Sequence, residues 1–296
     1  MREVAFDNEL EEDPLKDTHD QTIHVTSIAN SKIVEIELGK TLNINANLTS
    51  NQETKLIHLL RKYKEAFAWD YPDMKGIDPQ LFTHHIYIEK DVRPVRQPQR
   101  ILNPHLKDVV KAELQKLLDV NIIYPISYSK WVSPLMVVPK KSWKWRICVD
   151  YRELNKATQK DHFPLPFTDQ VLDTLAGKKF FSLLDGFNGY NQIQIAREDQ
   201  DKTTFTCPWG TFSYRFLPFG LCNAPATFQR AILSIFADLI NERLEVYMDD
   251  FTPYGEDFDP ALYTLEKGLQ RCIATRLCLN HEKCYMLMTE GLILGH

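Results

Sequence analysis

Residues 244–254 read LEVYMDDFTPY and hold two adjacent aspartates between two apolar runs. The runs at 244–248 and 251–254 predict two β-strands, with Asp249 and Asp250 in the turn that joins them. Two adjacent carboxylates repel each other, so holding both at a sheet turn lowers stability unless a cation lies beside them. Taken alone, an Asp-Asp pair is more often ordinary turn chemistry, and that interpretation stays open at this point.

A third aspartate follows another predicted buried strand. Residues 180–184, FFSLL, predict a short strand that ends at Asp185. If this strand neighbours the hairpin, Asp185, Asp249 and Asp250 converge on one spot. Such a set of oxygen ligands suits two hard divalent cations about 3.5–4 Å apart, which activate a 3′-hydroxyl and stabilise a departing pyrophosphate.

The flanking sequence predicts helices and strands in a mixed α+β order rather than the regular alternation of a doubly wound sheet. Predicted helices begin at capping or first-turn signals: Ser50-Asn51-Gln52-Glu53, Asn103-Pro104, Asn223 with Pro225, and Asp259-Pro260. Residues 131–139 and 145–149 predict a hairpin whose turn is basic. Further strands are predicted at 192–196, 211–216, 277–279, 285–288 and 292–294.

Composition indicates an ordinary globular protein: of 296 residues, 44% are hydrophobic and 25% are charged. No apolar run is long enough for a membrane span, and the acidic N-terminus lacks a secretory signal, so we expect no membrane partner. The six cysteines are predicted to be reduced intracellular thiols.

The charge is unevenly distributed along the chain. Residues 1–37 hold 3 basic and 10 acidic residues, whereas residues 90–160 hold 15 basic and 6 acidic residues, within a chain of net charge -5. A basic stripe of this kind fits a polyanion-binding face, with a merely solvated surface as an equal alternative.

Five sequence boxes resemble those of reverse transcriptases and occur in the order that those enzymes use. They are WRICVDYRELN (145–155), FSLLDGFNGYNQI (181–193), LPFGLCNAPATFQ (217–229), YMDD (247–250) and LNHEKC (279–284). With LPFG and the closing LGH (294–296), the region from about residue 62 onward most resembles the polymerase segment of gypsy-type long-terminal-repeat retrotransposons. The resemblance implies a right-hand polymerase core: fingers, and a palm built as an antiparallel sheet backed by helices.

The resemblance also implies an activity, RNA-directed DNA polymerisation from dNTPs onto a primer 3′-hydroxyl, with two Mg²⁺ ions (or Mn²⁺) as cofactors. Asp185 and Asp249 match the family's metal-binding carboxylates, and Asp250 completes the set. Lys283 matches a lysine proposed to protonate pyrophosphate in related polymerases. An ordinary solvated lysine is the alternative for this position.

Other residues match the family's nucleotide and nucleic-acid sites. Arg146 corresponds to a fingers residue that clamps the triphosphate. Tyr190 corresponds to the aromatic residue that blocks a 2′-hydroxyl, with a core aromatic as the alternative. The remaining nucleotide positions are Lys141 (or Lys140), Gly186, Phe187, Phe219 and Gly220, and the primer and template positions are Tyr247, Met248, Gln229, Leu294 and Gly295.

The predicted organisation has three parts. Residues 1–45 are an acidic flexible linker, residues 46–103 a helix with an extended lead-in, and residues 104–296 the fingers and palm. No ribonuclease H, protease or integrase motif is found and the thumb is incomplete, so we expect a segment of a Pol polyprotein or a degraded insertion. Expected partners are an RNA/DNA template–primer duplex, dNTPs and other Pol segments, in an intracellular, cytoplasmic virus-like particle if the element is expressed. The oligomeric state stays open.

Three interpretations of function remain at this stage: an active reverse transcriptase, an inert nucleic-acid-binding remnant, and a two-metal nuclease. The nuclease is disfavoured because such an enzyme needs neither Tyr190 to block a 2′-hydroxyl nor Arg146 to clamp a triphosphate. Cys278, His281 and Cys284 have a spacing that resembles zinc ligands, but they fall one short of a closed site. Asn121 stands where relatives have Gly, and Asn also tolerates the left-handed conformation.

Overall fold

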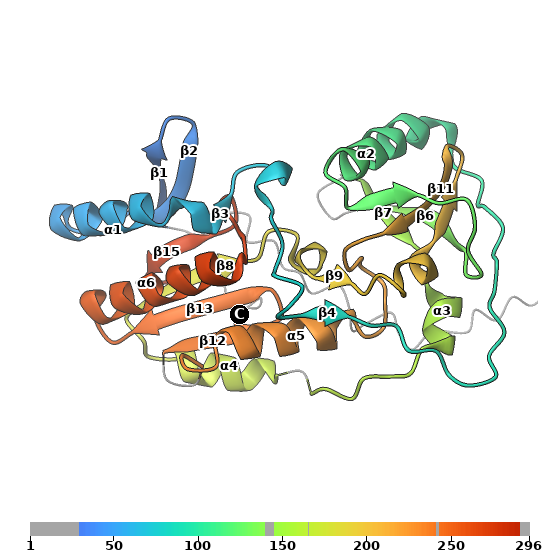
Figure 1. The fold of residues 1–296 in the computed structure, drawn as a ribbon. Coiled ribbons are helices and arrows are strands. Elements are labelled where there is room, and N and C mark those ends of the chain that lie inside the picture. The colour runs from blue at the N-terminus through green and yellow to red at the C-terminus, as the bar shows by residue number, and fades with distance from the viewer. Residues whose placement is uncertain (1–29, 140–144, 165, 241–242, 291–296) are drawn as a thin grey trace, which may run out of the picture.

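The computed structural model describes residues 30–139, 145–164, 166–240 and 243–290, and these form two sheet-containing parts (Figure 1). A six-stranded sheet with four helices lies at one end, and a five-stranded sheet with one helix across it lies at the other. The predicted α+β class is confirmed. We call the six-stranded sheet the palm sheet and the five-stranded sheet the fingers sheet.

The palm sheet carries the predicted aspartate hairpin. Its strands are β1 (Ser31–Glu37), β2 (Lys40–Asn45), β8 (Phe180–Asp185), β12 (Leu244–Tyr247), β13 (Asp250–Gly255) and β15 (Tyr285–Met288), in the order β1-β2-β15-β8-β13-β12. Neighbouring strands are antiparallel except β2 and β15, which are parallel. The hairpin is therefore β12 and β13, and Asp185 ends β8, as predicted. The turn, however, is formed by Met248 and Asp249 rather than by Asp249 and Asp250, because Asp250 pairs with Tyr247 as the first residue of β13.

Residues 31–45 correct one prediction, because they form the β1–β2 hairpin and not a flexible linker. Leu42 and Ile44 are 1% and 0% exposed and alternate with polar residues, so β2 buries one apolar face. Gly39 lies in the turn with φ +75°, a conformation that glycine adopts without strain. The first part of the predicted linker, residues 1–29, lies outside the described residues.

Helices cover the palm sheet on both faces. Helix α5 (Ala224–Ile235) and helix α6 (Phe258–Thr275) pack on one face, where Phe180 meets Phe258 edge-on at 5.9 Å and Phe236 meets Phe251 at 5.5 Å. Helix α4 (Thr168–Leu175) packs against the other face, in a small cluster with Phe181 and Tyr254. Helix α1 (Ser50–Lys62) lies beside α6. Because side chains alternate along a strand, Asp185 and Asp250 belong to the α4 face, away from α5 and α6.

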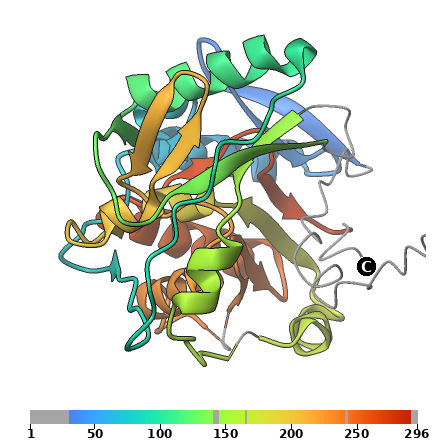
Figure 2. The ribbon, with the colours of Figure 1, turned by 90° about the vertical axis from the view of Figure 1, so that its right-hand side faces the viewer.

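The fingers sheet has the order β5-β11-β10-β6-β7. Its strands are β5 (Ile123–Pro125), β6 (Ser133–Pro139), β7 (Trp145–Val149), β10 (Phe205–Cys207) and β11 (Gly210–Tyr214). Helix α2 (Lys107–Asp119) lies across this sheet (Figure 2), and helix α3 (Arg152–Ala157) follows β7. The predicted hairpin is β6 and β7, and its basic turn with Lys140, Lys141 and Lys144 lies outside the described residues.

Short elements join the two parts. Strand β3 (Phe67–Ala68) pairs with β14 (Leu279–Asn280), and β4 (Thr83–His84) pairs with β9 (Gln194–Ile195). The 3₁₀ helices are Lys64–Ala66, Tyr71–Asp73, Pro104–Leu106, Gly189–Gln192 and Gln200–Thr203. In the described part of the chain no helix is both long and apolar enough to cross a membrane.

Several predicted boundaries shift. The capping box of α1 is formed by Thr49 and Gln52, one residue earlier than predicted. The predicted strand at 192–196 shortens to β9, because residues 189–192 form a 3₁₀ helix instead. Asn121 has φ +57°, the left-handed conformation that Asn tolerates. The predicted strand at 292–294 lies outside the described residues.

Candidate active site

The aspartate hairpin has a two-residue turn, since Tyr247 pairs directly with Asp250. Met248 adopts φ +54°, which is unfavourable for a side chain with a Cβ and needs support from its surroundings. That support comes from α5: the buried Gln229 accepts a hydrogen bond from the Met248 N–H through Oε1 at 2.8 Å. Gln229, predicted at the primer and template, therefore contacts the turn itself.

The structure brings the three predicted aspartates together. Asp250 lies directly opposite Asp185 in the antiparallel register of β13 and β8, and the Gly186 N–H donates to the Asp249 carbonyl at 2.9 Å. Burial, with a smaller contribution from Asp249, raises the pKa of Asp185 to about 6. Burial and repulsion from the other two carboxylates raise the pKa of Asp250 to about 8. Burial also raises the pKa of Asp249.

Lys283 forms an ion pair with one of these carboxylates, Asp185. Its ammonium lies 3.0 Å from Oδ2 and 3.3 Å from Oδ1 of Asp185. The next residue, Cys284, accepts a hydrogen bond from the Asp185 N–H on Sγ at 3.3 Å. Lys283 lowers the pKa of all three aspartates, so it offsets part of their mutual repulsion.

The donor chemistry of this cluster fits hard divalent cations, because carboxylate oxygens whose ionisation is disfavoured by burial and repulsion gain from a positive charge between them. Within residues 30–139, 145–164, 166–240 and 243–290, however, no group of three or more His, Cys, Asp or Glu side chains is arranged around a common metal position. The aspartates are thus neighbours in the sheet, with Asp185 held by Lys283.

The predicted nucleotide residues line a path from palm to fingers. Tyr190, in the 3₁₀ helix after β8, meets the Phe219 ring at 4.8 Å and the Phe228 ring at 5.4 Å. The Arg146 guanidinium, from β7, lies 5.8 Å from the centre of the Phe219 ring. Phe219 is 47% exposed, so its ring presents an apolar surface between a palm aromatic and a fingers cation. These three residues, far apart in the sequence, therefore form one continuous surface.

The remaining predicted residues have structural partners. Gly186 is buried beside Asp249, and Phe187 packs edge-on against Tyr71 at 5.6 Å. Gly220 has φ +97° and a Cβ there would lie 3.4 Å from the Val149 carbonyl oxygen. Lys141, Leu294 and Gly295 lie outside the described residues, so their assignments stay predictions.

Sequence reasoning missed three residues that support this site. Gln192 is fully buried and bonds to Phe187 and Cys278 through its amide. Tyr71 supports Phe187, and Asn43 of β2 donates hydrogen bonds to the turn that carries Lys283. Alternating apolar residues around Gly39 were the available signal for β2, whereas nothing local to Gln192 or Tyr71 indicates their partners.

The three residues whose spacing resembles zinc ligands, Cys278, His281 and Cys284, have separate partners. Cys278 Sγ contacts the Asp73 carbonyl at 3.7 Å, the His281 ring lies 4.8 Å from the Trp69 ring, and Cys284 contacts Asp185. These contacts give each side chain a packing role of its own.

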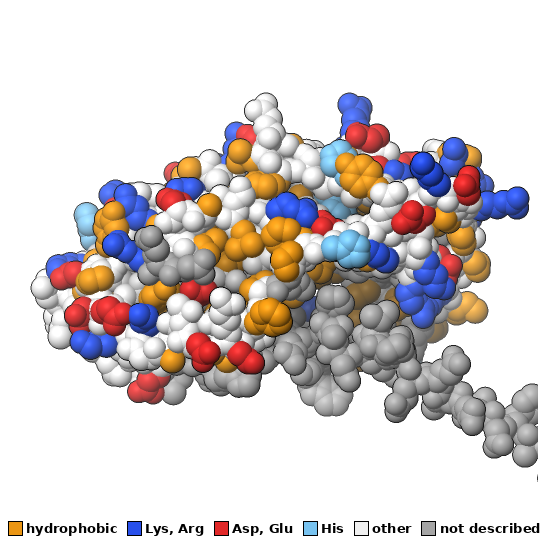
Figure 3. All heavy atoms as spheres, turned by 90° about the horizontal axis from the view of Figure 1, so that it is seen from below, with side chains coloured by type: hydrophobic (Ala, Val, Ile, Leu, Met, Phe, Trp, Pro, Cys, Tyr) orange, Lys and Arg blue, Asp and Glu red, His pale blue; other side chains and the backbone are white. Residues whose placement is uncertain are grey.

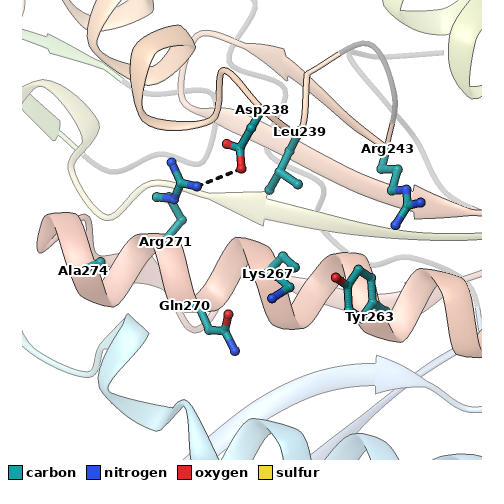
Figure 4. A pocket seen from close by; sticks show the side chains of 8 residues that line it. All are labelled: Asp238, Leu239, Arg243, Tyr263, Lys267, Gln270, Arg271 and Ala274. Carbon is teal, nitrogen blue, oxygen red and sulfur yellow. Dashed lines mark hydrogen bonds and ion pairs between the residues drawn. The ribbon is translucent and has the colours of Figure 1, made fainter.

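A separate pocket of about 500 Å³ lies between α6 and the segment before β12 (Figure 4). Arg271 pairs there with Asp238 at 2.9 Å, while Arg243 and Lys267 lie over the Tyr263 ring at 5.7 and 5.3 Å. Since α6 covers the face of the palm sheet opposite to Asp185, this pocket is distinct from the carboxylate cluster.

The fold is similar to that of solved reverse transcriptases. The chain superimposes on the foamy viral protease-reverse transcriptase solved in complex with an RNA/DNA hybrid with a TM-score of 0.76 and 25% identity, over 84% of this chain and 33% of that one. A form of that protein solved with double-stranded DNA gives a TM-score of 0.76 at 24% identity, over 84% and 43% of the two chains.

Comparison with curated proteins finds Pol polyproteins of transposons. The chain is 34% identical over 272 residues to the retrovirus-related Pol polyprotein from transposon 412 of Drosophila melanogaster, covering 86% of this chain and 22% of the relative. It is 28% identical over 290 residues to the transposon Tf2-3 polyprotein of Schizosaccharomyces pombe, covering 95% and 21%. The chain thus spans about a fifth of the length of these relatives.

A sequence model of one family matches more than half of the chain. The match covers residues 138–296, and the family is described as reverse transcriptase (RNA-dependent DNA polymerase). Together with the transposon relatives, it confirms the resemblance to gypsy-type retrotransposons indicated by the five boxes. The chain belongs to the reverse transcriptase family.

Proposed function

We propose that this chain catalyses RNA-directed DNA polymerisation, in which a primer 3′-hydroxyl attacks the α-phosphate of a dNTP and pyrophosphate leaves. The observation that carries the proposal is the register of the palm sheet, which sets Asp185 opposite Asp250 with Asp249 in the adjoining turn. A cluster of three carboxylates at a sheet end lowers stability, so a catalytic use explains its presence better than a structural one.

Asp185, Asp249 and Asp250 are the residues that would hold two Mg²⁺ ions, or Mn²⁺. When bound, such ions supply activation of the 3′-hydroxyl and neutralise charge on the departing pyrophosphate. Met248 and Tyr247 would contact the primer end, because they adjoin Asp249 in the supported turn. Lys283 contacts Asp185 in this structure, and its role as an acid for pyrophosphate stays a prediction.

The surface made by Tyr190, Phe219 and Arg146 supports a nucleotide site. Phe219 presents an exposed ring for the sugar and base, and Tyr190 closes the surface on the palm side. Arg146 carries a planar guanidinium that suits phosphate oxygens. Together these residues would bind a triphosphate and exclude a 2′-hydroxyl by steric contact with Tyr190.

The template–primer duplex would be bound mainly through its phosphates. Lysines of α2 (Lys107, Lys111 and Lys116) are exposed, and on the face seen from below in Figure 3 the fingers end also carries Lys and Arg side chains, with Asp and Glu among them. The foamy viral relative was solved with an RNA/DNA hybrid, which supports the same class of partner here. Binding should therefore weaken steeply as salt concentration rises. The predicted intracellular location and the other Pol segments as partners stay predictions.

A primer-extension assay on the full chain tests the proposal. Wild type should add dNTPs to a primer on an RNA template, and Asp249→Asn should reduce the rate by about a thousand-fold, because one carboxylate of the cluster loses its charge. Asp173→Asn, on the exposed side of α4, is the matched control and should keep wild-type activity. Duplex binding without extension by the wild-type chain would favour the inert remnant. Degradation of the template without incorporation would favour a nuclease.

A further inference from the structure

The turn that carries Lys283 is held by the N-terminal hairpin. Asn43 Nδ2, on β2, donates to the carbonyls of Glu282 and Cys284, each at 3.1 Å. These two carbonyls flank Lys283, so one amide fixes the backbone on both sides of the lysine. Asn45, two residues along β2, donates to the Leu287 carbonyl at 2.9 Å and anchors the strand that follows.

Hydrogen bonds within residues 280–284 also hold the same turn. The Asn280 carbonyl accepts from the N–H groups of Lys283 at 3.2 Å and Cys284 at 3.1 Å, and its side-chain oxygen accepts from the Glu282 N–H at 3.1 Å. On the other side, Cys284 Sγ accepts from the Asp185 N–H. The Lys283 backbone therefore has a defined position relative to Asp185, and the lysine reaches the carboxylate from a fixed base.

The ion pair between Lys283 and Asp185 is partly shielded from water. The Asp185 side chain is 12% exposed and the Lys283 side chain is 37% exposed. Both carboxylate oxygens of Asp185 lie within 3.3 Å of the ammonium. An ion that used these oxygens would have to approach a positive charge at contact distance, which is strongly unfavourable in a half-buried site.

We propose that Lys283 is an internal cation that holds Asp185 in the absence of a divalent ion and must leave it when the ion binds, and that Asn43 is the positioning residue that keeps Lys283 there. This inference rests on the proposed function, since it assumes that Asp185 binds a metal ion. It makes the N-terminal hairpin a determinant of metal affinity, although β2 contributes no metal ligand.

Manganese titration of the full chain, without nucleic acid or nucleotide, tests this inference through the Mn²⁺ dissociation constant measured by electron paramagnetic resonance. Lys283→Met removes the competing charge and should tighten Mn²⁺ binding by about five-fold, the equivalent of a partly buried ion pair. Lys283→Arg keeps the charge and should keep the wild-type affinity. Lys267→Met makes the same change of net charge on α6, where the lysine lies over Tyr263, and is the matched control.

Asn43→Ala provides an independent route to the same result. It should tighten Mn²⁺ binding by about two-fold in the wild-type background and have no effect in the Lys283→Met background, because the two residues act through one ion pair. Equal effects of Asn43→Ala in both backgrounds would overturn its positioning role. Circular dichroism of each variant verifies that the fold is retained.

The outcomes separate this inference from the proposed function. If wild type binds Mn²⁺ at a site that Asp249→Asn abolishes, and Lys283→Met leaves that affinity unchanged or weaker, the competition is refuted while the metal site stands. If neither wild type nor Lys283→Met binds Mn²⁺, the inference and the metal part of the proposed function both fail. Primer extension by the wild-type chain reports on polymerisation separately.

Discussion

Acidification should destabilise this protein through His84, a buried imidazole that contacts helix α5. His84 is 2% exposed, and its Nδ1 lies 2.9 Å from the hydroxyl of Thr227 on α5, the helix that also supports the Met248 turn. Burial lowers the pKa of His84 from 6.5 to about 4, and the nearby Asp199 counteracts only part of this effect. The folded state thus disfavours the charged imidazole that the unfolded chain accepts.

Proton linkage gives the sign and the size of the change in the free energy of unfolding with pH. Between pH 6.5 and about pH 4 the unfolded chain binds a proton at His84 that the folded chain does not, so the free energy of unfolding falls as the pH falls. The contribution is fully present above pH 6.5 and is lost progressively down to about pH 4. At about 1.4 kcal/mol per pH unit, the loss is about 2 kcal/mol at pH 5 and about 3 kcal/mol when complete.

Urea unfolding of wild type and His84→Asn at about pH 8 and about pH 5 measures this contribution. Asn keeps a polar atom near Thr227 but cannot take up a proton, so the variant should lose about 2 kcal/mol less than wild type over this range. His105→Asn removes an exposed imidazole and is the matched control, with the wild-type difference retained. Identical pH dependence in wild type and His84→Asn would refute the assignment of a buried neutral imidazole.

Two further predictions concern packing and selectivity. A Cβ on Gly255 would lie 2.5 Å from the Ala261 backbone nitrogen, so Gly255→Ala should lower the free energy of unfolding by about 1–3 kcal/mol, whereas Gly268→Ala, with nothing within 4 Å, should raise it by about 0.5–1 kcal/mol. Equal thermal midpoints for the two variants would contradict the close packing of α6 on β13. Tyr190→Ala should raise rNTP incorporation relative to dNTP by about ten-fold or more in primer extension, and an unchanged ratio would remove Tyr190 as the gate.

Local patterns predicted the hairpin and the strand before Asp185 because both depend on short apolar runs bounded by turn residues. The pairing of β2 with β15 joins Asn43 and Tyr285, which are remote in the sequence, and no local pattern encodes such a contact. The linker prediction for residues 31–45 failed because acidic side chains on the exposed positions outweighed the alternation of Leu42 and Ile44. The contact between Lys283 and Asp185 is also long-range, so sequence reasoning assigned the lysine a role without its partner.

The site depends on residues well outside the family match. The match begins at residue 138, yet the lysine on Asp185 is positioned by Asn43, and Phe187 of the nucleotide segment packs on Tyr71. Strand β2 also covers the edge of β15, whose backbone N–H and C=O groups would otherwise be unpaired next to the fully buried Met286. Since β15 pairs in turn with β8, only one strand separates β2 from β8, the strand that ends at Asp185. Within the described residues, the candidate site is therefore supported from the hairpin at Ser31 onward.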